Sequence, residues 1–242
     1  MLDYVETNGK SLWIILFMIL IETGFNKIIF IIRKDIEDAF IGRRINMNYR
    51  LLKVYLNMWR IVPFYMLCIH CKFKDKVRLD IAMWKEKNKK LKEYSELFQF
   101  GYFSMNIIEF RNVMLNRLHR NKMSYVISRI LFKPLDSLYI NMPPEKIGGG
   151  LYFQHGFSTI VAAKEIGENC SINQQVTIGY NGENAPVIGN NVTITVGAIV
   201  IGDIHISDCA FVGAGAVVKH DVEIGDIVAG VPAVSIKDKV KK

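Results

Sequence analysis

Cysteines are scarce in this chain, and their spacing excludes a disulfide framework. The sequence of 242 residues has four of them, without the regular pairs of a disulfide-rich domain. The segment Cys68–Cys71 resembles half of a zinc site, but no second pair of ligands lies at a suitable distance. Cys170 falls on a repeat position that predicts a core residue. We therefore expect no metal and a reducing compartment.

The N-terminal sequence predicts neither a signal peptide nor an uninterrupted membrane span. Residues 1–10 carry two acids and one base, and no small-x-small cleavage pattern follows. The apolar residues 12–32 are interrupted by Glu22, Asn26 and Lys27, which favours a helix buried in the N-terminal domain or lying at a membrane surface over a spanning helix. We expect a cytoplasmic protein, either free or at the inner face of the membrane, with peripheral contact through its N-terminal half.

Positive charge is in excess, but it is local. The net charge is +8, and nine lysines and arginines lie between Lys72 and Lys92 against three acids. This run is typical of a solvated helix face, and a patch near anionic lipid is the second interpretation. Because no nucleic-acid fold signature accompanies the charge, we expect no nucleic-acid partner.

An internal repeat of six residues dominates the second half of the chain. From Ile188 onward, a second apolar residue follows each repeat position four residues later. A unit of this length supplies one short strand and one corner, and three units close a triangular coil, so the repeat predicts a parallel β-helix. An ordinary β-sandwich would instead show alternation at period two. The repeat positions from the first to the last are Ile147, Phe153, Ile166, Ile172, Ile178, Ile188, Ile194, Val200, Ile206, Val212, Val218 and Ile224.

Two interruptions of the repeat predict local irregularities. Phe153 and Ile166 are thirteen positions apart, one more than two units, which predicts a bulge in the corner after residues 154–156. Ile178 and Ile188 are ten positions apart, so one unit has four additional residues. Residues 180–186 have turn chemistry and should project as a loop. Insertions in solenoids tend to lie on the binding face, so both irregularities indicate a site.

The change in composition predicts two domains in an α+β protein. Residues 1–138 lack the repeat and read as a helical N-terminal domain, and residues 139–242 form the β-helix domain. The paired prolines Pro143 and Pro144 suit an extended linker at this boundary. In the first part we expect helices over residues 106–119 and 124–132, and a kinked packed helix over residues 51–71.

The repeat and three short segments together resemble a known family. Residues 150–155, 174–179 and 229–233 are similar to the serine acetyltransferase branch of the hexapeptide-repeat acyltransferases, which includes relatives encoded with bacterial surface-polysaccharide genes. The resemblance covers residues 139–237 and is looser over Ile108–Asn112 in the helical part. It implies a left-handed β-helix, a homotrimer, and acetyl-CoA as cosubstrate in the groove between neighbouring β-helices.

The resemblance places His155 on the position of the family's catalytic histidine. Imidazole can take the proton of an acceptor hydroxyl near neutral pH, so we expect a general base and direct acetyl transfer without an acyl-enzyme. Backbone N–H groups at the coil corners would stabilise the oxyanion. His205 should face the solvent, and the spacing of His155, His205 and His220 does not suit the zinc site of a γ-class carbonic anhydrase.

The resemblance also implies the cofactor contacts. Small residues let the linear thiol arm of CoA approach the backbone, and basic residues can hold its phosphates. The candidates for the pantetheine channel are Thr195, Val196, Ala214 and Gly215, and those for the phosphates are Lys219, His220 and Lys237. Val234 replaces a basic residue that is common in relatives.

Several positions depart from the family pattern. Gln154 stands where serine-specific relatives have an acid, and residues 184–186 read Asn-Ala-Pro instead of Arg-His-Pro. Ile140 replaces the acid expected to orient the catalytic imidazole, although the carbonyl of the adjacent Asn141 could substitute for it. A selective site for free serine needs a cation for the carboxylate and an anion for the ammonium, and the sequence offers neither at these positions.

The departures favour a neutral sugar hydroxyl as the acceptor. Gln154, Asn181 and Asn184 suit the recognition of hydroxyls, so we expect O-acetylation of a cell-surface glycan or its precursor. Two alternatives stay open: an L-serine O-acetyltransferase of cysteine biosynthesis, and a trimeric scaffold without catalytic activity.

Overall fold

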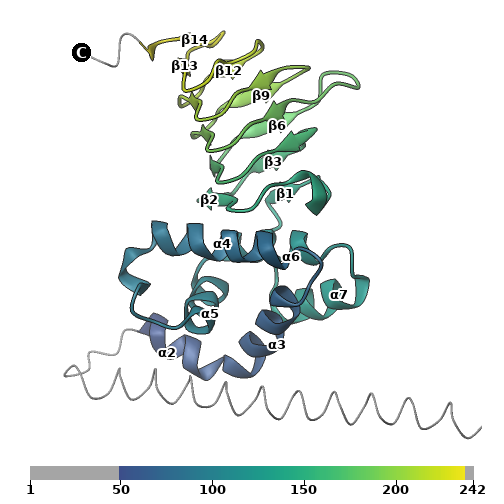
Figure 1. The fold of residues 1–242 in the computed structure, drawn as a ribbon, viewed down its shortest axis with the longest axis vertical. Helices are drawn as coiled ribbons and strands as arrows, with labels where there is room; N and C mark the ends of the chain where they lie inside the picture. The colour runs from purple at the N-terminus through teal and green to yellow at the C-terminus, as the bar shows by residue number, and fades with distance from the viewer. Residues whose placement is uncertain (1–48, 238–242) are drawn as a thin grey trace, which may run out of the picture. The chain divides into compact units, whose positions relative to one another are not determined.

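The computed structural model describes residues 49–237, in which helices precede a stack of short strands (Figure 1). The apolar segment of residues 12–32 lies outside the described residues. The α-helices are α2 (Tyr49–Leu56), α3 (Met58–Ile69), α4 (Lys74–Lys87), α5 (Glu96–Asn106), α6 (Ile108–Leu118) and α7 (Lys122–Leu131). In this part of the chain, no helix is both long enough and apolar enough to cross a bilayer.

Short polar residues set the limits of the helices. Asn57 separates α2 from α3, and its side-chain amide donates to the carbonyl of Lys53 at 2.7 Å, whereas Pro63 is accommodated inside α3. The predicted helix over residues 106–119 begins only at Ile108, because Asn106 ends α5. Ser95 and Asn121 cap α5 and α7 by accepting from backbone N–H groups of the first turn. The helices therefore divide at more points than hydrophobic periodicity alone predicts.

The strands form three parallel sheets around one core, which confirms the helical region followed by a parallel β-helix (Figure 1). The five-stranded sheet contains β1 (Leu138–Ile140), β3 (Thr159–Val161), β6 (Thr177–Gly179), β9 (Ile199–Ile201) and β12 (Val217–Val218). The three-stranded sheet contains β4 (Glu165–Ile166), β7 (Val187–Ile188) and β10 (His205–Ile206). The six-stranded sheet contains β2 (Tyr152–Gln154), β5 (Ser171–Asn173), β8 (Thr193–Ile194), β11 (Phe211–Val212), β13 (Ile227–Ala229) and the antiparallel β14 (Val234–Ser235).

The repeat positions from Ile147 to Val218 are buried in the core, but the expectation for Ile224 is wrong. Ile224 is 70% exposed, while Val222 and Val228 are buried. Val222 pairs with Ile206, which is only sixteen positions earlier. The last coil is therefore two residues shorter than a regular coil of three six-residue units. The shortened coil moves the inward-facing register away from Ile224.

Both interruptions of the repeat appear as local features of the coil. Phe153 pairs with Ile172, and Val161 pairs with Ile178. The segment between Phe153 and Val161 is therefore two residues longer than the segment between Ile172 and Ile178. The repeat unit that follows Val161 is one residue short. The four additional residues of the other interruption form a turn, in which Asn181 and Asn184 exchange both backbone hydrogen bonds. The predicted loop of residues 180–186 is thus shorter, since Ala185 and Pro186 are buried.

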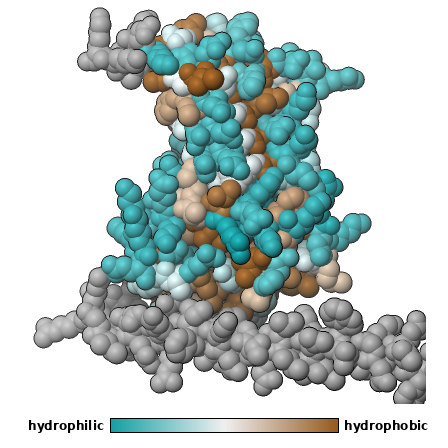
Figure 2. Space-filling model, in the orientation of Figure 1, coloured by the Kyte–Doolittle hydropathy of each residue, from teal (hydrophilic) through white to brown (hydrophobic). Residues whose placement is uncertain are grey.

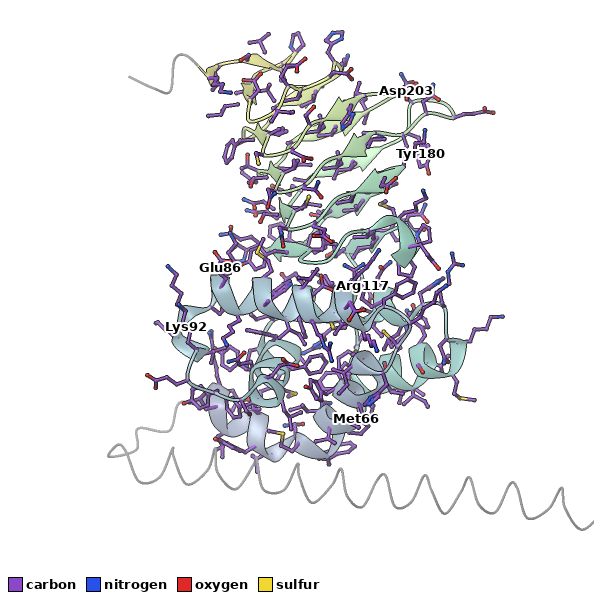
Figure 3. All side chains as sticks on the ribbon, viewed as in Figure 1. Met66, Glu86, Lys92, Arg117, Tyr180 and Asp203 are labelled. Carbon is purple, nitrogen blue, oxygen red and sulfur yellow. The ribbon has the colours of Figure 1, made fainter. Side chains whose placement is uncertain are left out.

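A buried ion pair joins the helices to the first coil (Figure 3). Arg117 of α6 donates from Nε to Asp80 of α4 at 2.9 Å and from Nη2 to the carbonyl of Gly148 at 2.6 Å. Trp84 donates from Nε1 to the carbonyl of Leu151 at 2.9 Å. Residues 49–237 accordingly belong to one compact unit, and the domain boundary at residue 138 stays a prediction.

Candidate functional site

His155 follows β2, at the corner where the chain passes from the six-stranded to the five-stranded sheet. Its φ is 55°, in the left-handed region, and its side chain is exposed. At the equivalent corner of the next coil, the left-handed residue is Gln175. The pairing of Ile160 with Thr177 aligns Gln175 with Ser158, which is also left-handed. The left-handed His155 is therefore additional, which confirms the predicted irregular corner and turns its side chain outward.

A pocket of about 470 Å³ adjoins this corner. Its β-helix side is formed by β2 and His155, and its helical side by the end of α4, the α5–α6 connection and the start of α6. The polar residues that line it are Asn88, Asn106, Glu109, Arg111, Tyr152, Gln154 and His155. The helical part thus supplies most of the wall around the residue predicted to be the general base.

Glu109 is the acidic residue of this pocket. A Cβ placed on Gly156 would lie 3.2 Å from Glu109 Cγ, so the side chain passes directly over the residue that follows His155. Burial, together with the charge of Glu109, raises the pKa of the Tyr152 phenol. The repeat predicts no site role for Glu109, because it does not extend to α6. The signal for Glu109 lies in the segment Ile108–Asn112, where the helical part loosely resembles the family.

Arg111 holds the α5–α6 connection in place. Its guanidinium donates to the backbone carbonyls of Ser104 at 2.6 Å, Met105 at 3.4 Å and Lys133 at 3.0 Å. Burial and the nearby charge of Arg60 lower the pKa of Arg111, and Glu109 acts in the opposite direction. Arg111 thereby fixes the backbone next to the pocket.

A second pocket, of about 420 Å³, lies on the outer face of the six-stranded sheet. Hydroxyl and amide side chains in register form its floor: Gln154, Ser171, Asn173, Thr193 and Thr195. Tyr152, Phe211 and Lys87 complete the wall. Gln154 and Tyr152 line both pockets, so the predicted cofactor residue Thr195 lies on a continuous surface with the His155 corner.

The other predicted pantetheine residues lie on the same edge as His155. The N–H of Gly215 donates to the carbonyl of Val196 at 2.9 Å, and the N–H of Gly197 donates to that of Gln174 at 3.1 Å. Successive coils therefore align Val196, then Ala214 and Gly215, along the edge that begins at His155. Ala214 and Gly215 are exposed there, which leaves the backbone open to a linear ligand.

The remaining predicted residues lie on the other two edges of the same chain. Asn181 and Asn184 follow β6, and Lys219 and His220 follow β12, so both groups occupy the edge after the five-stranded sheet. Figure 3 shows Tyr180 and Asp203 on that edge. Lys237 lies near the third edge, with Nζ 3.8 Å from a Cβ placed on Gly225. One chain thus brings Gln154 to His155, but it does not bring Asn181 or Asn184 there.

The imidazole of His155 makes no hydrogen bond within residues 49–237. Ile140 is the last residue of β1, and the backbone N–H of Asn141 donates to the carbonyl of Val161 at 2.9 Å. Across the described part of the chain, no group of three histidines, cysteines or acids is arranged to hold a metal ion. The charged and titratable side chains that line the pocket at this corner include the His155 imidazole, the Glu109 carboxylate and the Arg111 guanidinium.

No protein-family model matches the chain. A serine acetyltransferase of Helicobacter pylori (strain J99 / ATCC 700824) is 37% identical over 103 residues, which are 40% of this chain and 60% of that protein. The structure of serine acetyltransferase from Brucella abortus strain S19 in complex with coenzyme A has a TM-score of 0.52 and 20% identity, over 89% of this chain and 91% of that one. Soybean serine acetyltransferase complexed with serine has a TM-score of 0.53 and 21% identity, over 85% and 90%.

The chain has the fold of the serine acetyltransferases. It spans about three fifths of the length of the Helicobacter protein, so the sequence match is concentrated in one part of each molecule.

The expectation of a glycan acceptor, with its role in polysaccharide biosynthesis, is wrong. Relatives in sequence and neighbours in structure are serine acetyltransferases, which favours the alternative acceptor. The physical reason is that the repeat reveals only β-helix positions such as Gln154, which carry no charge for a zwitterion. The pocket also includes Glu109 from α6, which no repeat pattern reveals.

Proposed function

We propose that the protein is an L-serine O-acetyltransferase that uses acetyl-CoA as cosubstrate. The observation that carries the proposal is the irregular corner at His155, where an exposed imidazole borders a pocket and begins the edge of small residues that ends at Gly215. Relatives named serine acetyltransferase, and the same fold in a coenzyme A complex and a serine complex, support it. Thr195, Val196, Ala214 and Gly215 would line the pantetheine arm, with Lys219, His220 and Lys237 as phosphate contacts.

In the proposed reaction His155 is the general base. It takes the proton of the serine hydroxyl as that oxygen attacks the thioester carbonyl. The new ester C–O bond forms and the C–S bond breaks, and the imidazolium returns the proton to the departing thiolate of CoA. Backbone N–H groups at the corner would stabilise the oxyanion. Direct transfer of the acetyl group needs no nucleophilic side chain, so no acyl-enzyme forms.

A homotrimer would complete this site. Apolar side chains point outward from the five-stranded sheet, where Tyr139 pairs with Ile160, and Ile199 follows two strands further along. Figure 2 shows apolar surface among hydrophilic residues along this part of the β-helix. Packing such faces together would bring the edge with Asn181 and Asn184 of one subunit towards the His155 edge of the next, which would reunite the residues that one chain separates.

The test is serine-dependent release of CoA from acetyl-CoA by wild type and His155→Ala. We expect wild-type turnover and a loss of roughly 10²- to 10⁴-fold in kcat for the variant. His205→Ala is the matched control, because His205 is an exposed histidine of the same β-helix that lies on another face. Coenzyme A binding without turnover of serine would overturn the proposal and support the scaffold alternative.

A further inference from the structure

The proposed acceptor poses a charge problem that the β-helix alone does not solve. Free serine carries an ammonium and a carboxylate, and a site that excludes uncharged alcohols needs a partner for each. At the corner, the β-helix offers Gln154, whose side-chain amide is neutral. The pocket beside His155 contains one carboxylate, and it belongs to α6.

We propose that Glu109 is a specificity-determining residue that binds the ammonium group of the acceptor in the pocket beside His155. This inference rests on the proposed function. It gives α6 a direct part in choosing the substrate, in addition to its packing against the first coil. Gln154 stands where serine-specific relatives have an acid. Glu109, which lies outside the repeat, would supply that acid from α6.

The position of Glu109 is fixed from two sides. Its Cγ would lie 3.2 Å from a Cβ on Gly156, the residue next to His155. Glu109 and Tyr152 of β2 line the same pocket, and the charge of Glu109 contributes to the raised pKa of the Tyr152 phenol. An ammonium group bound there would lie close to the imidazole, as a short β-hydroxy amino acid requires.

The carboxylate is also free to bind a ligand. Within the described residues, no hydrogen bond or ion pair is made to Glu109, although its side chain is only half-exposed. The nearby Arg111 directs its donors to the carbonyls of Ser104, Met105 and Lys133. A cationic ligand would stabilise a partly buried carboxylate that has no hydrogen-bond or ion-pair partner, because charge-assisted hydrogen bonds are stronger than neutral ones.

Gly156 makes the approach of Glu109 possible. A methyl group there would lie 3.1 Å from Leu138 Cδ2 and 3.2 Å from Glu109 Cγ, which is closer than ordinary van der Waals contact. The glycine after His155 thus leaves the space through which the helix reaches the corner. The acid and the general base are brought together by packing between α6 and the first coil.

The test compares two acceptors that differ only in the ammonium group, L-serine and 3-hydroxypropanoate. Wild type, Glu109→Gln and a control, Glu223→Gln, are assayed as full chains with acetyl-CoA. Glu223 is exposed and lies at the far end of the β-helix, so its substitution changes the net charge equally without touching the pocket. The readout is the ratio of kcat/KM for serine to kcat/KM for 3-hydroxypropanoate.

We expect Glu109→Gln to lower this ratio by roughly ten- to a hundred-fold, mainly through KM for serine, with KM for acetyl-CoA unchanged. The Glu223 variant should keep the wild-type ratio. If Glu109 instead orients His155 or only supports the fold, both acceptors lose activity equally and the ratio stays constant, which overturns the inference alone. If wild type does not acetylate serine, the proposed function fails and this inference fails with it.

Discussion

At the scale of single residues, burial decides which charges are structural and which can act on a ligand. Asp80 and Arg117 are fully buried and satisfy each other, with the N–H groups of Gly150 and Leu151 as further partners of Asp80. Glu109 is partly buried and makes no hydrogen bond or ion pair with the described residues. The buried pair joins α4 and α6 to the first coil, and Glu109, which also belongs to α6, lines the pocket beside that coil.

Arg117→Met should therefore lower the free energy of unfolding by about 3 to 5 kcal/mol, since it leaves a buried carboxylate without a cation. Burial already raises the pKa of Asp80, and Arg117 opposes that shift. Without Arg117 the pKa rises further, so stability is lost as pH rises from the unfolded-state pKa near 4 through the folded-state pKa. Urea unfolding from pH 5 to pH 8 measures this trend.

The control for that measurement is Arg120→Met, which breaks the exposed pair with Glu145. Because solvent screens this pair, the control should change stability little at any pH. Equal destabilisation by the two variants, or a loss for Arg117→Met that shrinks as pH rises, would contradict the structural role of the buried pair.

At the scale of elements, the sequence predicts what is local and periodic. The repeat identifies the β-helix and its two irregular corners, because each inward aliphatic residue depends only on its own coil. It fails at Ile224, where a coil two residues short shifts the register. The repeat also gives no signal for Glu109, because the contact between α6 and the His155 corner depends on long-range packing through Arg117 and Asn112. The candidate site was thus predictable on its β-helix side alone.

Deletion of residues 181–184 tests whether the inserted turn serves the acceptor site. The turn is closed by hydrogen bonds between Asn181 and Asn184, and its removal restores six positions between Ile178 and Ile188. We expect the thermal midpoint to stay within a few degrees, because no core residue is lost. We expect KM for serine to rise about ten-fold or more if the turn reaches a neighbouring subunit's pocket.

Glu183→Gln is the control for the deletion, because it keeps the turn and removes only an exposed charge. A deletion variant with unchanged KM and kcat would exclude Asn181 and Asn184 from acceptor binding. A strongly lowered midpoint would instead show that the turn is part of the coil's stability.

At the scale of the whole molecule, the described chain does not bring all of the predicted site residues together. His155, Glu109 and the small residues up to Gly215 share one region, whereas Asn181, Lys219 and Lys237 lie on the other two edges. The outward face of the five-stranded sheet, with its exposed apolar residues, is the surface that an assembly would cover. Assembly and activity should therefore be lost together.

Ile160→Glu tests this coupling by placing a charge on that face, where Ile160 is 45% exposed in the single chain. Burying an unpaired carboxylate against another subunit is costly, so we expect the proposed trimer to dissociate and CoA release to fall in proportion. Ile224→Glu is the matched control, since Ile224 is an exposed isoleucine outside the strands of this sheet. Light scattering gives the mass, circular dichroism confirms the retained fold, and an Ile160→Glu protein that stays trimeric or a monomer with full activity would refute the coupling.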